Sequence, residues 1–496
     1  MPEVFKTYND VRNKISSNRE IVNTEMHLLS LPVQEAIIST FDICNFLVDK
    51  LEELDNKISK NSSNSSNPPS TDPKKKINPN KGKTGKNTGG QPGHKGSNLK
   101  MVENPSVVIT HSPKGKCDCG KTLAGLDLCP SGARQVFEIE IVNKVIEHQT
   151  LSGFCSCGVE HCGEFPEGIN GSTQYGESVR GIVSYLSTYQ IIPSERLAEL
   201  MGDLFNYPLS EGTVDNIKNE GTEHLSDFDL KIQDAILTQK IGNVDETPIR
   251  VGGHSGYLHV FCNTALSYIS YHSKRGMKAV VDIGILDKFK GILIHDCFSM
   301  YFNYGGKHAV CNGHLLRELE FVIEQYSFVW AKEMKTFLLD ANDLVKMSKT
   351  GNEILFDHLD CEKFEEEFKG ILLRGRFEMS FLIGNVKNEG KRRGKQHPAL
   401  NLCNRMLKLQ KEVLLFLRDF DVPFTNNEAE RALRMSKVQM KVSGCFRSED
   451  GARCFALFRS YIQTMKKHGL NIFVGIKNLF NPKGNATLDL IFRPQS

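Results

Sequence analysis

The chain has 496 residues, of which 39% are hydrophobic and 24% charged, and its formal net charge is only +3. This length predicts two to four domains with at least one sizeable core, and so small a net charge does not by itself indicate a nucleic-acid partner. We find no long uncharged apolar window and no signal pattern, so we expect a cytoplasmic protein with no transmembrane helix and no membrane partner. Thiols stay reduced in that compartment, so the 14 cysteines should be metal ligands or core residues.

Residues 1–60 form the first predicted segment, with a helix from about residue 30 to residue 60. Apolar residues recur along this helix at spacings of four, three and four, at Leu47, Leu51, Leu54 and Ile58. That spacing is typical of a coiled-coil seam and would favour a homo-oligomer. A surface helix packed on its own domain gives the same pattern, so both interpretations stay open.

A basic arm is expected at residues 61–100. The arm is rich in Ser, Asn, Pro, Gly and Lys, which cannot bury enough apolar surface to offset the entropy of ordering, so we expect it to be disordered. Residues 73–100 contain eight lysines and no acid. Such a run suits a DNA backbone, although many charge runs are only solvated tails. The candidate DNA-binding residues here are Lys74, Lys75, Lys76, Lys81, Lys83 and Lys95.

Residues 101–168 should be a small zinc-binding module, because six of the 14 cysteines gather there. The candidate zinc ligands are two pairs that each precede a glycine, Cys117 with Cys119 and Cys155 with Cys157. Four thiolates suit a structural Zn²⁺, which would stabilise a module too small for its own core. Each pair has a single intervening residue, which strains the ligand geometry. Alternative ligands are therefore His111, Cys129, His161 and Cys162, and a metal-free cluster of buried thiols is also compatible.

Residues 172–240 are predicted to be helical. Within them, residues 194–219 are compatible with a helix-turn-helix in which Leu209 and Ser210 cap the second helix. Any pair of packed helices gives a similar pattern.

From residue 241 the apolar period changes from that of helices to that of strands. We expect strands at 243–251, 257–263 and 266–272, a helix at 277–289 and a buried strand at 291–296. This order is the opening of an RNase H-like fold, whose first part would be residues 241–307. Residues 308–420 should form a helical insertion, and residues 421–480 the second part of the core.

Two aspartates occupy positions in this sheet that suggest chemistry. Asp245 lies inside the first strand, where a charge is costly unless something such as a cation compensates it. Asp296 ends the buried strand, and open sheets place their sites at the carboxyl ends of strands. A third carboxylate would come from Glu428 or Glu430, and capping of the helix near Thr425 explains either equally well.

Three carboxylates from separate elements can hold two Mg²⁺ or Mn²⁺ ions for an in-line phosphoryl displacement. The helix that bears the third carboxylate continues with basic residues before the next acid. These residues would hold DNA against the metals, although a solvated helix face is the alternative. They are Arg431, Arg434, Lys437, Lys441 and Arg447.

Five short segments of the sequence together resemble the transposases of the insertion-sequence-66 family, along nearly the whole chain. The resemblance lies in residues 60–66, 89–96, 244–248, 295–296 and 426–434. The family pattern Asn-x-x-Glu-Arg-x-x-Arg selects Asn427, Glu430, Arg431 and Arg434, and so favours Glu430 over Glu428. The resemblance implies a DDE transposase, an enzyme of metal-dependent phosphoryl transfer on DNA, with Asp245, Asp296 and Glu430 as catalytic metal ligands.

The resemblance also implies the fold class: a multidomain α/β protein with an RNase H-like mixed-sheet core interrupted by a helical insertion, and with a zinc-binding domain. It implies transposon ends and target DNA as partners, two small accessory proteins of the same element, and a nucleoid-associated location. A hydrolytic nuclease of the RNase H fold would use the same carboxylates, and an inactive transposase-derived DNA-binding protein is a third possibility.

A Cys-x-x-His pair, Cys311 and His314, resembles one found in several DDE enzymes. As a lone pair it cannot complete a zinc site, so we expect it to serve core packing. Arg317 and Glu318 should form local ion pairs on the same helix.

Overall fold

The structure is a computed structural model that describes residues 8–59, 99–350, 358–382, 396–481 and 484–493. The predicted lysines of the arm, Lys74, Lys75, Lys76, Lys81, Lys83 and Lys95, lie outside the described residues. The chain divides into two compact units. Unit 1 comprises Met1–Pro79, Gly171–Ala198 and Ser210–Ser496, and unit 2 comprises Asn80–Asn170 and Glu199–Leu209.

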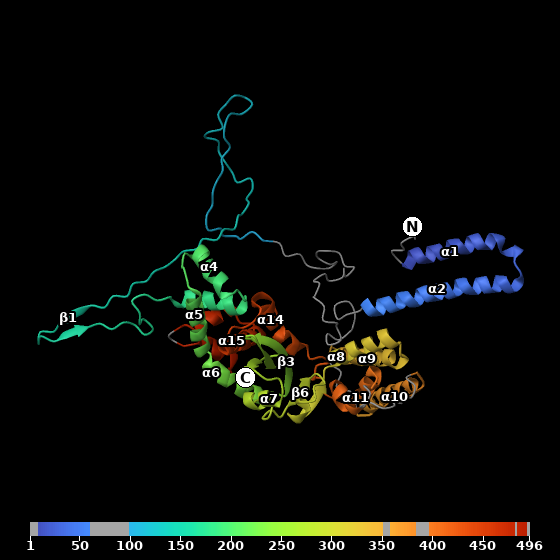
Figure 1. Ribbon diagram of the computed structural model, residues 1–496. Helices are drawn as coiled ribbons and strands as arrows, with labels where there is room; N and C mark the ends of the chain where they lie inside the picture. Colours follow the sequence, from blue (N-terminus) through green and yellow to red (C-terminus); the bar gives the residue numbers. More distant parts are fainter. Residues whose placement is uncertain (1–7, 60–98, 351–357, 383–395, 482–483, 494–496) are drawn as a thin grey trace. The chain divides into compact units, whose positions relative to one another are not determined.

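The N-terminal segment is a helical hairpin. α1 (Tyr8–Glu25) and α2 (Leu31–Ser59) are joined through the short 3-10 helix η1 (Met26–Leu28) and run back along one another (Figure 1). The guanidinium group of Arg12 on α1 pairs with Asp49 on α2 at 2.7 Å. α2 corresponds to the helix expected at 30–60, and its residues Leu47 and Leu51 are 52% and 55% exposed. The coiled coil itself stays a prediction.

One feature of α2 bears on the expectation of no transmembrane helix. The stretch Leu31–Glu52 is long and apolar enough to span a membrane by length and composition, and 6% of its most apolar window is buried. Core helices and signal sequences pass the same test, so this feature is weak evidence for a membrane.

The centre of unit 1 is a five-stranded mixed sheet with the order β5-β4-β3-β6-β7 (Figure 1). β4 runs antiparallel to its two neighbours β3 and β5, whereas β6 and β7 continue the sheet in parallel with β3. Four strands lie where the sequence pattern predicts them, and β7 lies at the start of the region that was expected to be mostly helical. The strands are β3 (Ile241–Val251), β4 (His254–Cys262), β5 (Ser267–His272), β6 (Ile292–His295) and β7 (Lys307–Val310).

One face of the antiparallel strands packs against α14 (Asn427–Ser443) and α15 (Glu449–Lys467) in a shared apolar cluster. α15 also covers the edge strand β5. The backbone N–H of Ile269 donates to the Ser460 hydroxyl at 2.7 Å. The N–H of Ser267 donates to the Thr464 hydroxyl at 3.1 Å. These contacts satisfy edge amides that would otherwise offer a template for another strand.

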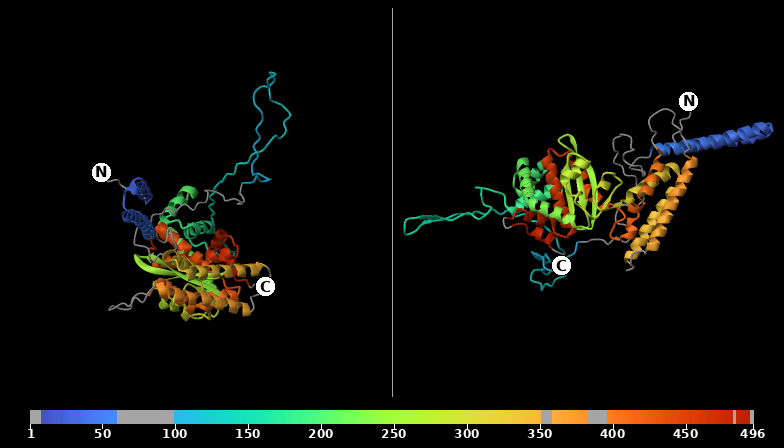
Figure 2. Two further views of the ribbon diagram at one scale, coloured as in Figure 1. Left: turned by 90° about the vertical axis from the view of Figure 1, so that its right-hand side faces the viewer. Right: turned by 90° about the horizontal axis from the view of Figure 1, so that it is seen from below.

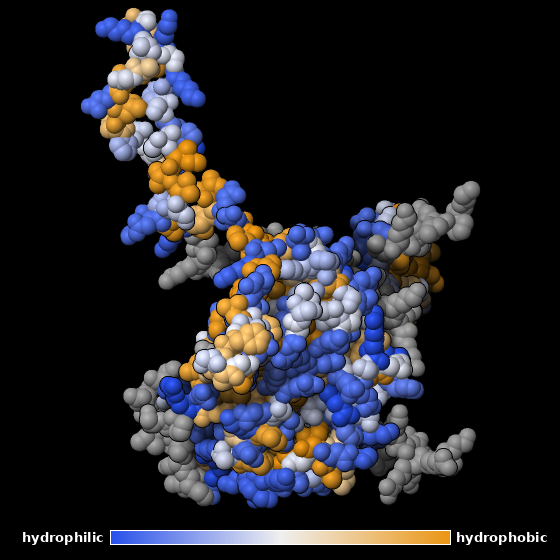
Figure 3. All heavy atoms as spheres, turned by 90° about the vertical axis from the view of Figure 1, so that its left-hand side faces the viewer, coloured by the Kyte–Doolittle hydropathy of each residue, from blue (hydrophilic) through white to orange (hydrophobic). Residues whose placement is uncertain are grey.

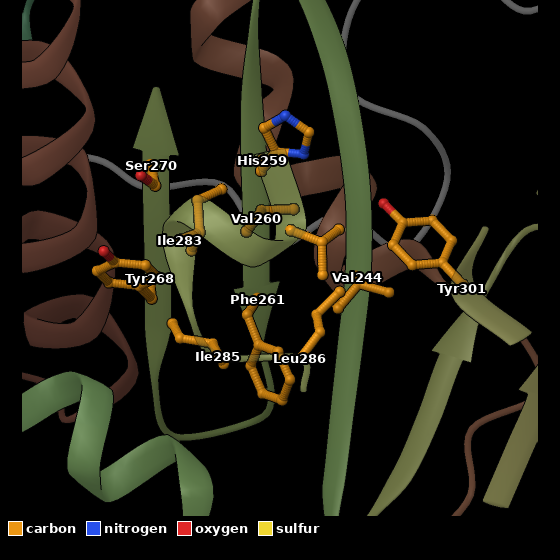
Figure 4. A pocket seen from close by; sticks show the side chains of 11 residues that line it. Val244, His259, Val260, Phe261, Tyr268, Ser270, Ile283, Ile285, Leu286 and Tyr301 are labelled. Atoms are coloured by element: carbon orange, nitrogen blue, oxygen red, sulfur yellow. The ribbon is translucent and has the colours of Figure 1, made fainter. Parts of the chain in front are cut away.

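α7 (Met277–Ile283) lies over the opposite face (Figure 4). It is shorter than the helix expected at 277–289, because Gly284 adopts a left-handed conformation with φ of 72° and ends it. Between α7 and the sheet lies a cavity of about 30 Å³ lined by Val244, Phe261 and Tyr268 among others. A cavity of this size admits about one water molecule and is too small for a nucleotide.

A helical region follows β7 and covers the span predicted as an insertion (Figure 2). Its core includes the fully buried Trp330 and Phe368 and continues into residues of β6 and β7. Gly375 lets two of its helices approach closely, since a Cβ atom there would lie 2.4 Å from Cγ of Trp330. The helices are α8 (Asn312–Tyr326), α9 (Val329–Thr350), α10 (His358–Leu382), α11 (Pro398–Lys408), α12 (Gln410–Val413) and α13 (Leu415–Arg418).

Most of residues 172–240 form helices. Ser210 caps α5, where its hydroxyl accepts a hydrogen bond from the N–H of Thr213 at 3.1 Å. The helix-turn-helix arrangement stays a prediction. The elements here are α3 (Glu177–Ser184), the π-helix η3 (Tyr185–Tyr189), α4 (Ser194–Phe205), α5 (Glu211–Glu223) and α6 (Ser226–Leu237). Three short helices lie elsewhere in the chain: the 3-10 helix η4 (Tyr301–Asn303), α16 (Ile472–Asn478) and α17 (Ala486–Ile491).

The described part of unit 2 contains little regular structure beyond the end of α4. Its strands β1 (Ser152–Phe154) and β2 (Glu160–Cys162) pair antiparallel. Large apolar side chains lie exposed along it, including Ile139 at 91% and Val145 at 88%. The upper part of Figure 3 shows such hydrophobic residues interspersed with hydrophilic ones. Unit 2 therefore buries little apolar surface within itself.

Candidate active site

Asp245 and Asp296 lie at matching positions on neighbouring parallel strands. Asn243 of β3 is in register with Ile294 of β6. Asp245 and Asp296 each follow that pair by two residues, beyond the point where β3 and β6 stop pairing with each other, although β3 itself continues beside β4 to Val251. The two aspartates therefore lie at the same level of the sheet, at the carboxyl end of β6, and open α/β sheets place their ligands at such strand ends.

The Asp245 carboxyl lies in a buried and negatively charged environment. Burial, together with the charges of Glu246, Asp296 and Glu430, raises its pKa to about 7. One hydrogen bond opposes this shift, because the N–H of Glu246 donates to Asp245 Oδ1 at 2.9 Å. Carboxylates that repel one another in a partly buried place have the donor set and the excess negative charge that suit a hard divalent cation.

The first turn of α14 is tied to β3 through Asn426. The side-chain amide of Asn243 donates to Asn426 Oδ1 at 2.9 Å. The amide of Asn426 in turn donates to the backbone oxygen of Val244 at 2.7 Å. Because Asn426 immediately precedes α14, these buried bonds hold the helix that carries Glu430 beside the strand that carries Asp245.

The two candidate glutamates of α14 have different partners. Glu428 lies 3.5 Å from the ammonium group of Lys467 on α15. Glu430 instead lies near α8, with its Oε1 atom 3.6 Å from His314 Nδ1 and 3.5 Å from Arg317 Nη2. Neither glutamate belongs to a capping box at Thr425 or Asn427, since the N-cap residue of α14 is Asn426, whose side chain makes no capping hydrogen bond.

The helix after β7 corrects two sequence-based expectations. Arg317 and Glu318 do not form local ion pairs: Arg317 lies beside Glu430, and Glu318 pairs with Arg405 of α11. Cys311 and His314 are not a lone pair, because Glu430 joins them. Within the described ranges, these three residues are the only group of three or more cysteine, histidine and acidic residues whose ligand atoms all lie within 4.8 Å of one another.

A second network cross-links the residues beside the two aspartates, and no local sequence signal predicts it. The Glu246 side chain is only 3% exposed, and Arg275 Nη2 lies 2.6 Å from its Oε1 atom. The hydroxyl of Tyr301 donates to the other carboxylate oxygen. The Arg275 guanidinium also lies 4.4 Å from the ring centre of Phe298, whose backbone N–H donates to Asp296 Oδ1 at 2.8 Å. Figure 4 shows the Tyr301 ring beside β3.

The basic residues of α14 follow Glu430 along one side of the helix. Arg434, Lys437 and Lys441 stand four, seven and eleven residues after Glu430 and are exposed. Lys437 Nζ donates to the backbone oxygen of Pro248 on β3 at 3.3 Å. Burial lowers the pKa of the Lys437 ammonium group, and the Asp245 carboxylate opposes this shift. Arg431 is exposed as well, and Arg447 pairs with Glu211 at 3.4 Å.

The two cysteine pairs of unit 2 form equivalent turns. The N–H of Gly120 donates to the oxygen of Cys117 at 2.7 Å, and the N–H of Gly158 donates to the oxygen of Cys155 at 2.8 Å. Both glycines have positive φ, of 83° and 84°. A hydrogen bond from Cys119 lowers the pKa of the Cys117 thiol, and Cys157 acts likewise on Cys155. Among the described residues, no three ligand atoms of this segment lie within 4.8 Å of one another.

Comparison with known proteins identifies the family. The sequence profile described as Transposase IS66 family matches residues 172–454, more than half of the chain. The chain belongs to the IS66 family of transposases. The matched span includes the sheet, the helical region and all three acidic residues. A second profile, of a family of unknown function (DUF6444), matches residues 27–100. No curated protein matches the chain.

Proposed function

We propose that this IS66-family transposase is a DDE enzyme that cuts the ends of its insertion sequence and joins them to target DNA, with Asp245, Asp296 and Glu430 as the catalytic carboxylates. The observation that carries the proposal is the placement of the three side chains. Two each lie two residues beyond the last registered pair of the parallel strands β3 and β6, and the third lies on a helix tied to β3 by Asn426.

The sheet supports an RNase H-like core. Three antiparallel strands lie on one side of the order and two strands parallel to β3 on the other. The helical region between β7 and α14 would be the insertion that accounts for the 134 positions from Asp296 to Glu430.

Asp245, Asp296 and Glu430 lie near enough for the last two to act electrostatically on Asp245. Such a set of carboxylates would suit a pair of Mg²⁺ or Mn²⁺ ions, which when bound would activate the attacking oxygen and stabilise the leaving one. The chain's own part is to hold these carboxylates close together and to keep the Asp245 carboxyl shielded from water. The attacking groups would be water in the cleavage step and the freed 3′-hydroxyl in the joining step. No covalent intermediate with the protein is needed.

DNA would be held by the basic side of α14, through Arg431, Arg434 and Lys437 with Lys441 and Arg447, and by the lysine-rich arm. Exposed cations at helical spacing beyond Glu430 would contact the phosphates next to the scissile bond. Replacing Lys74, Lys75, Lys76, Lys81 and Lys83 with Gln should flatten the salt dependence of DNA affinity by about 0.9 in log–log slope per lost contact. An unchanged slope would mean that the arm is only a solvated linker.

Further proposals concern the surroundings of the catalytic core. Cys117, Cys119, Cys155 and Cys157 would hold a structural Zn²⁺, for which the two equivalent turns and the sparse core of unit 2 are the support. A homo-oligomer, two accessory proteins of the same element and a nucleoid-associated cytoplasmic location are proposed on the family alone.

The test is a cleavage and joining assay on DNA that carries the terminal repeats of the element. Asp296→Asn should abolish Mg²⁺-dependent cleavage and leave DNA binding nearly intact, because the phosphate contacts come from other residues. Cleavage at the wild-type rate in this variant would contradict the proposal. Cleavage without joining by the wild-type enzyme would instead indicate a hydrolytic nuclease, and binding without cleavage an inactive DNA-binding protein.

A further inference from the structure

Next to the proposed magnesium ligands lies a group of side chains with a different chemical preference. The sulfur of Cys311, a ring nitrogen of His314 and a carboxylate oxygen of Glu430 all lie within 4.8 Å of one another. Cys311 immediately precedes α8, His314 lies in its first turn, and Glu430 comes from α14. Two separate helices therefore converge on one point.

One observation at this point is not explained by core packing. The Nδ1 atom of His314 is buried without a hydrogen-bond partner, although it faces Glu430 Oε1 at 3.6 Å. A buried polar atom without a partner is costly unless something else binds it. Cys311 is 1% exposed. Its sulfur accepts a hydrogen bond from the N–H of Asn426 at 3.1 Å.

We propose that Cys311, His314 and Glu430 form a site for a soft divalent cation such as Zn²⁺, which takes Glu430 away from the catalytic magnesium ions and so inhibits the transposase. Sulfur, imidazole nitrogen and carboxylate oxygen are the donors that Zn²⁺ selects, whereas Mg²⁺ prefers oxygen alone. The three donors leave a fourth position for water.

Two features set the strength of the site. Arg317 Nη2 lies 3.5 Å from the same Glu430 oxygen, and its cation opposes a metal ion there. The Arg317 side chain is 58% exposed, so it can turn into solvent when a cation binds. As the metal–sulfur bond forms, the Cys311 thiol gives its proton to the buffer. The proposal of a metal site rests on the positions of the three ligand atoms. Only the proposed inhibition rests on the proposed function.

Co²⁺ is a suitable probe, because a cobalt–thiolate bond produces a charge-transfer absorption that reports the sulfur ligand directly. The full chain is titrated with Co²⁺ as wild type, Cys311→Ser and His314→Gln, with Cys403→Ser as the matched control. Cys403 is also a buried cysteine, but it lies in α11 and bonds to the oxygen of Leu372. Any cobalt bound by unit 2 is common to all four proteins and cancels in the difference.

The expected result is that Cys311→Ser and His314→Gln each bind one Co²⁺ fewer per chain than wild type and Cys403→Ser. Equal stoichiometry and spectra in all four proteins would overturn the proposal. If Cys311→Ser does not fold, the partly exposed His314 still decides the question through its own variant.

Inhibition is measured separately, as the Zn²⁺ concentration that halves each variant's own Mg²⁺-dependent cleavage. This concentration should rise at least about tenfold in Cys311→Ser, equivalent to roughly 1.4 kcal/mol of binding, and should not change in Cys403→Ser. An equal Zn²⁺ response in both variants would overturn the inhibitory role. A wild-type protein that never cleaves DNA would count against the proposed function alone, because the Co²⁺ titration requires no activity.

Discussion

The side-chain amide of Asn243 donates a hydrogen bond of 2.9 Å to the side-chain oxygen of Asn426, although 183 positions separate the two residues. Asn243 precedes Asp245 by two residues on β3, and Asn426 precedes Glu430 by four at the start of α14. Both asparagines are buried, so the bond fixes the distance between a strand and a helix that the long helical region separates in sequence. The geometry of the proposed site depends on this bond.

Replacing Asn426 with Ala should lower the free energy of unfolding by roughly 2–3 kcal/mol, because Asn243 and the oxygen of Val244 would lose their buried partner. Denaturant unfolding measures the change. The neighbouring Asn427 is exposed, so Asn427→Ala should change the stability by less than about 0.5 kcal/mol. Similar losses in both variants would mean that the helix start, and not the bond to β3, is what matters.

The raised pKa of Asp245 predicts how the stability of the magnesium-free protein depends on pH. The folded pKa is about 7, against an ordinary value of 3.8. Between these values the unfolded chain loses a proton that the folded chain keeps, so the stability falls as pH rises through 7. Asp245→Asn should therefore stabilise the magnesium-free protein at pH 8, on the order of 1–4 kcal/mol at about 1.4 kcal/mol per unit of pKa difference.

Thermal unfolding across the pH range provides the check. The advantage of Asp245→Asn should disappear near pH 4, where the wild-type carboxyl is protonated in both states. Added Mg²⁺ should stabilise the wild type at pH 8 and leave the variant unchanged. A variant less stable than wild type at pH 8 would show that the Asp245 carboxylate is compensated by the fold itself.

The network around Glu246 should set the magnesium requirement. Arg275 contacts both Glu246, which follows Asp245, and the ring of Phe298, whose N–H binds Asp296. Arg275→Ala should raise the Mg²⁺ concentration for half-maximal cleavage by about tenfold or more, the usual scale for groups that orient metal ligands. Arg275→Lys should restore part of the loss, because a cation remains for Glu246.

Arg374 provides the control, since it pairs with Glu333 on exposed helix surfaces at 2.9 Å. Arg374→Ala removes a comparable ion pair away from the sheet edge, so the magnesium requirement should not change. If Arg275→Ala also leaves the Mg²⁺ requirement unchanged, the network around Glu246 contributes only packing and does not position the magnesium ligands.

Much of the sheet is predictable from the sequence, because β3, β4 and β5 are short runs rich in β-branched and aromatic residues with turn residues between them. β7 has only four residues, too few for a period to emerge, and follows Gly305 and Gly306. The helix expected at 277–289 ends early because Gly284 takes a left-handed conformation, while apolar residues beyond it continue the helical pattern. The local sequence pattern therefore predicts which helices and strands form better than it predicts where they end.

The site is less predictable than the sheet. Asp245 and Asp296 are visible as charged residues in apolar strands. The contacts of Arg275 with Glu246 and of Cys311 with Glu430 join distant segments, and no local period encodes them. The choice between Glu428 and Glu430 also depends on the resemblance to a family, because both residues have the spacing of a capping glutamate and only their partners in the structure differ.

The cysteine pairs of unit 2 predict a metal dependence that the rest of the chain does not share. Purified protein should contain Zn²⁺, and a chelator should unfold unit 2, because its apolar residues are too exposed to hold it folded. The four-fold Cys→Ser variant at Cys117, Cys119, Cys155 and Cys157 should lose this zinc and become sensitive to proteolysis within residues 101–168. If the purified protein contains no zinc and a chelator does not alter its fold, the proposal of a zinc-binding module is refuted.

The most direct test of the central claim compares Glu430→Gln with Glu428→Gln in Mg²⁺-dependent cleavage of element-end DNA. The two glutamates are two positions apart on one helix, with exposed fractions of 35% and 37%, so they differ mainly in what they face. Glu430→Gln should slow cleavage about a hundredfold or more, equivalent to roughly 3 kcal/mol of the barrier, with DNA binding retained. Glu428→Gln should cleave at nearly the wild-type rate. Wild-type cleavage by Glu430→Gln, or an equal loss in Glu428→Gln, would contradict the assignment of the third catalytic carboxylate.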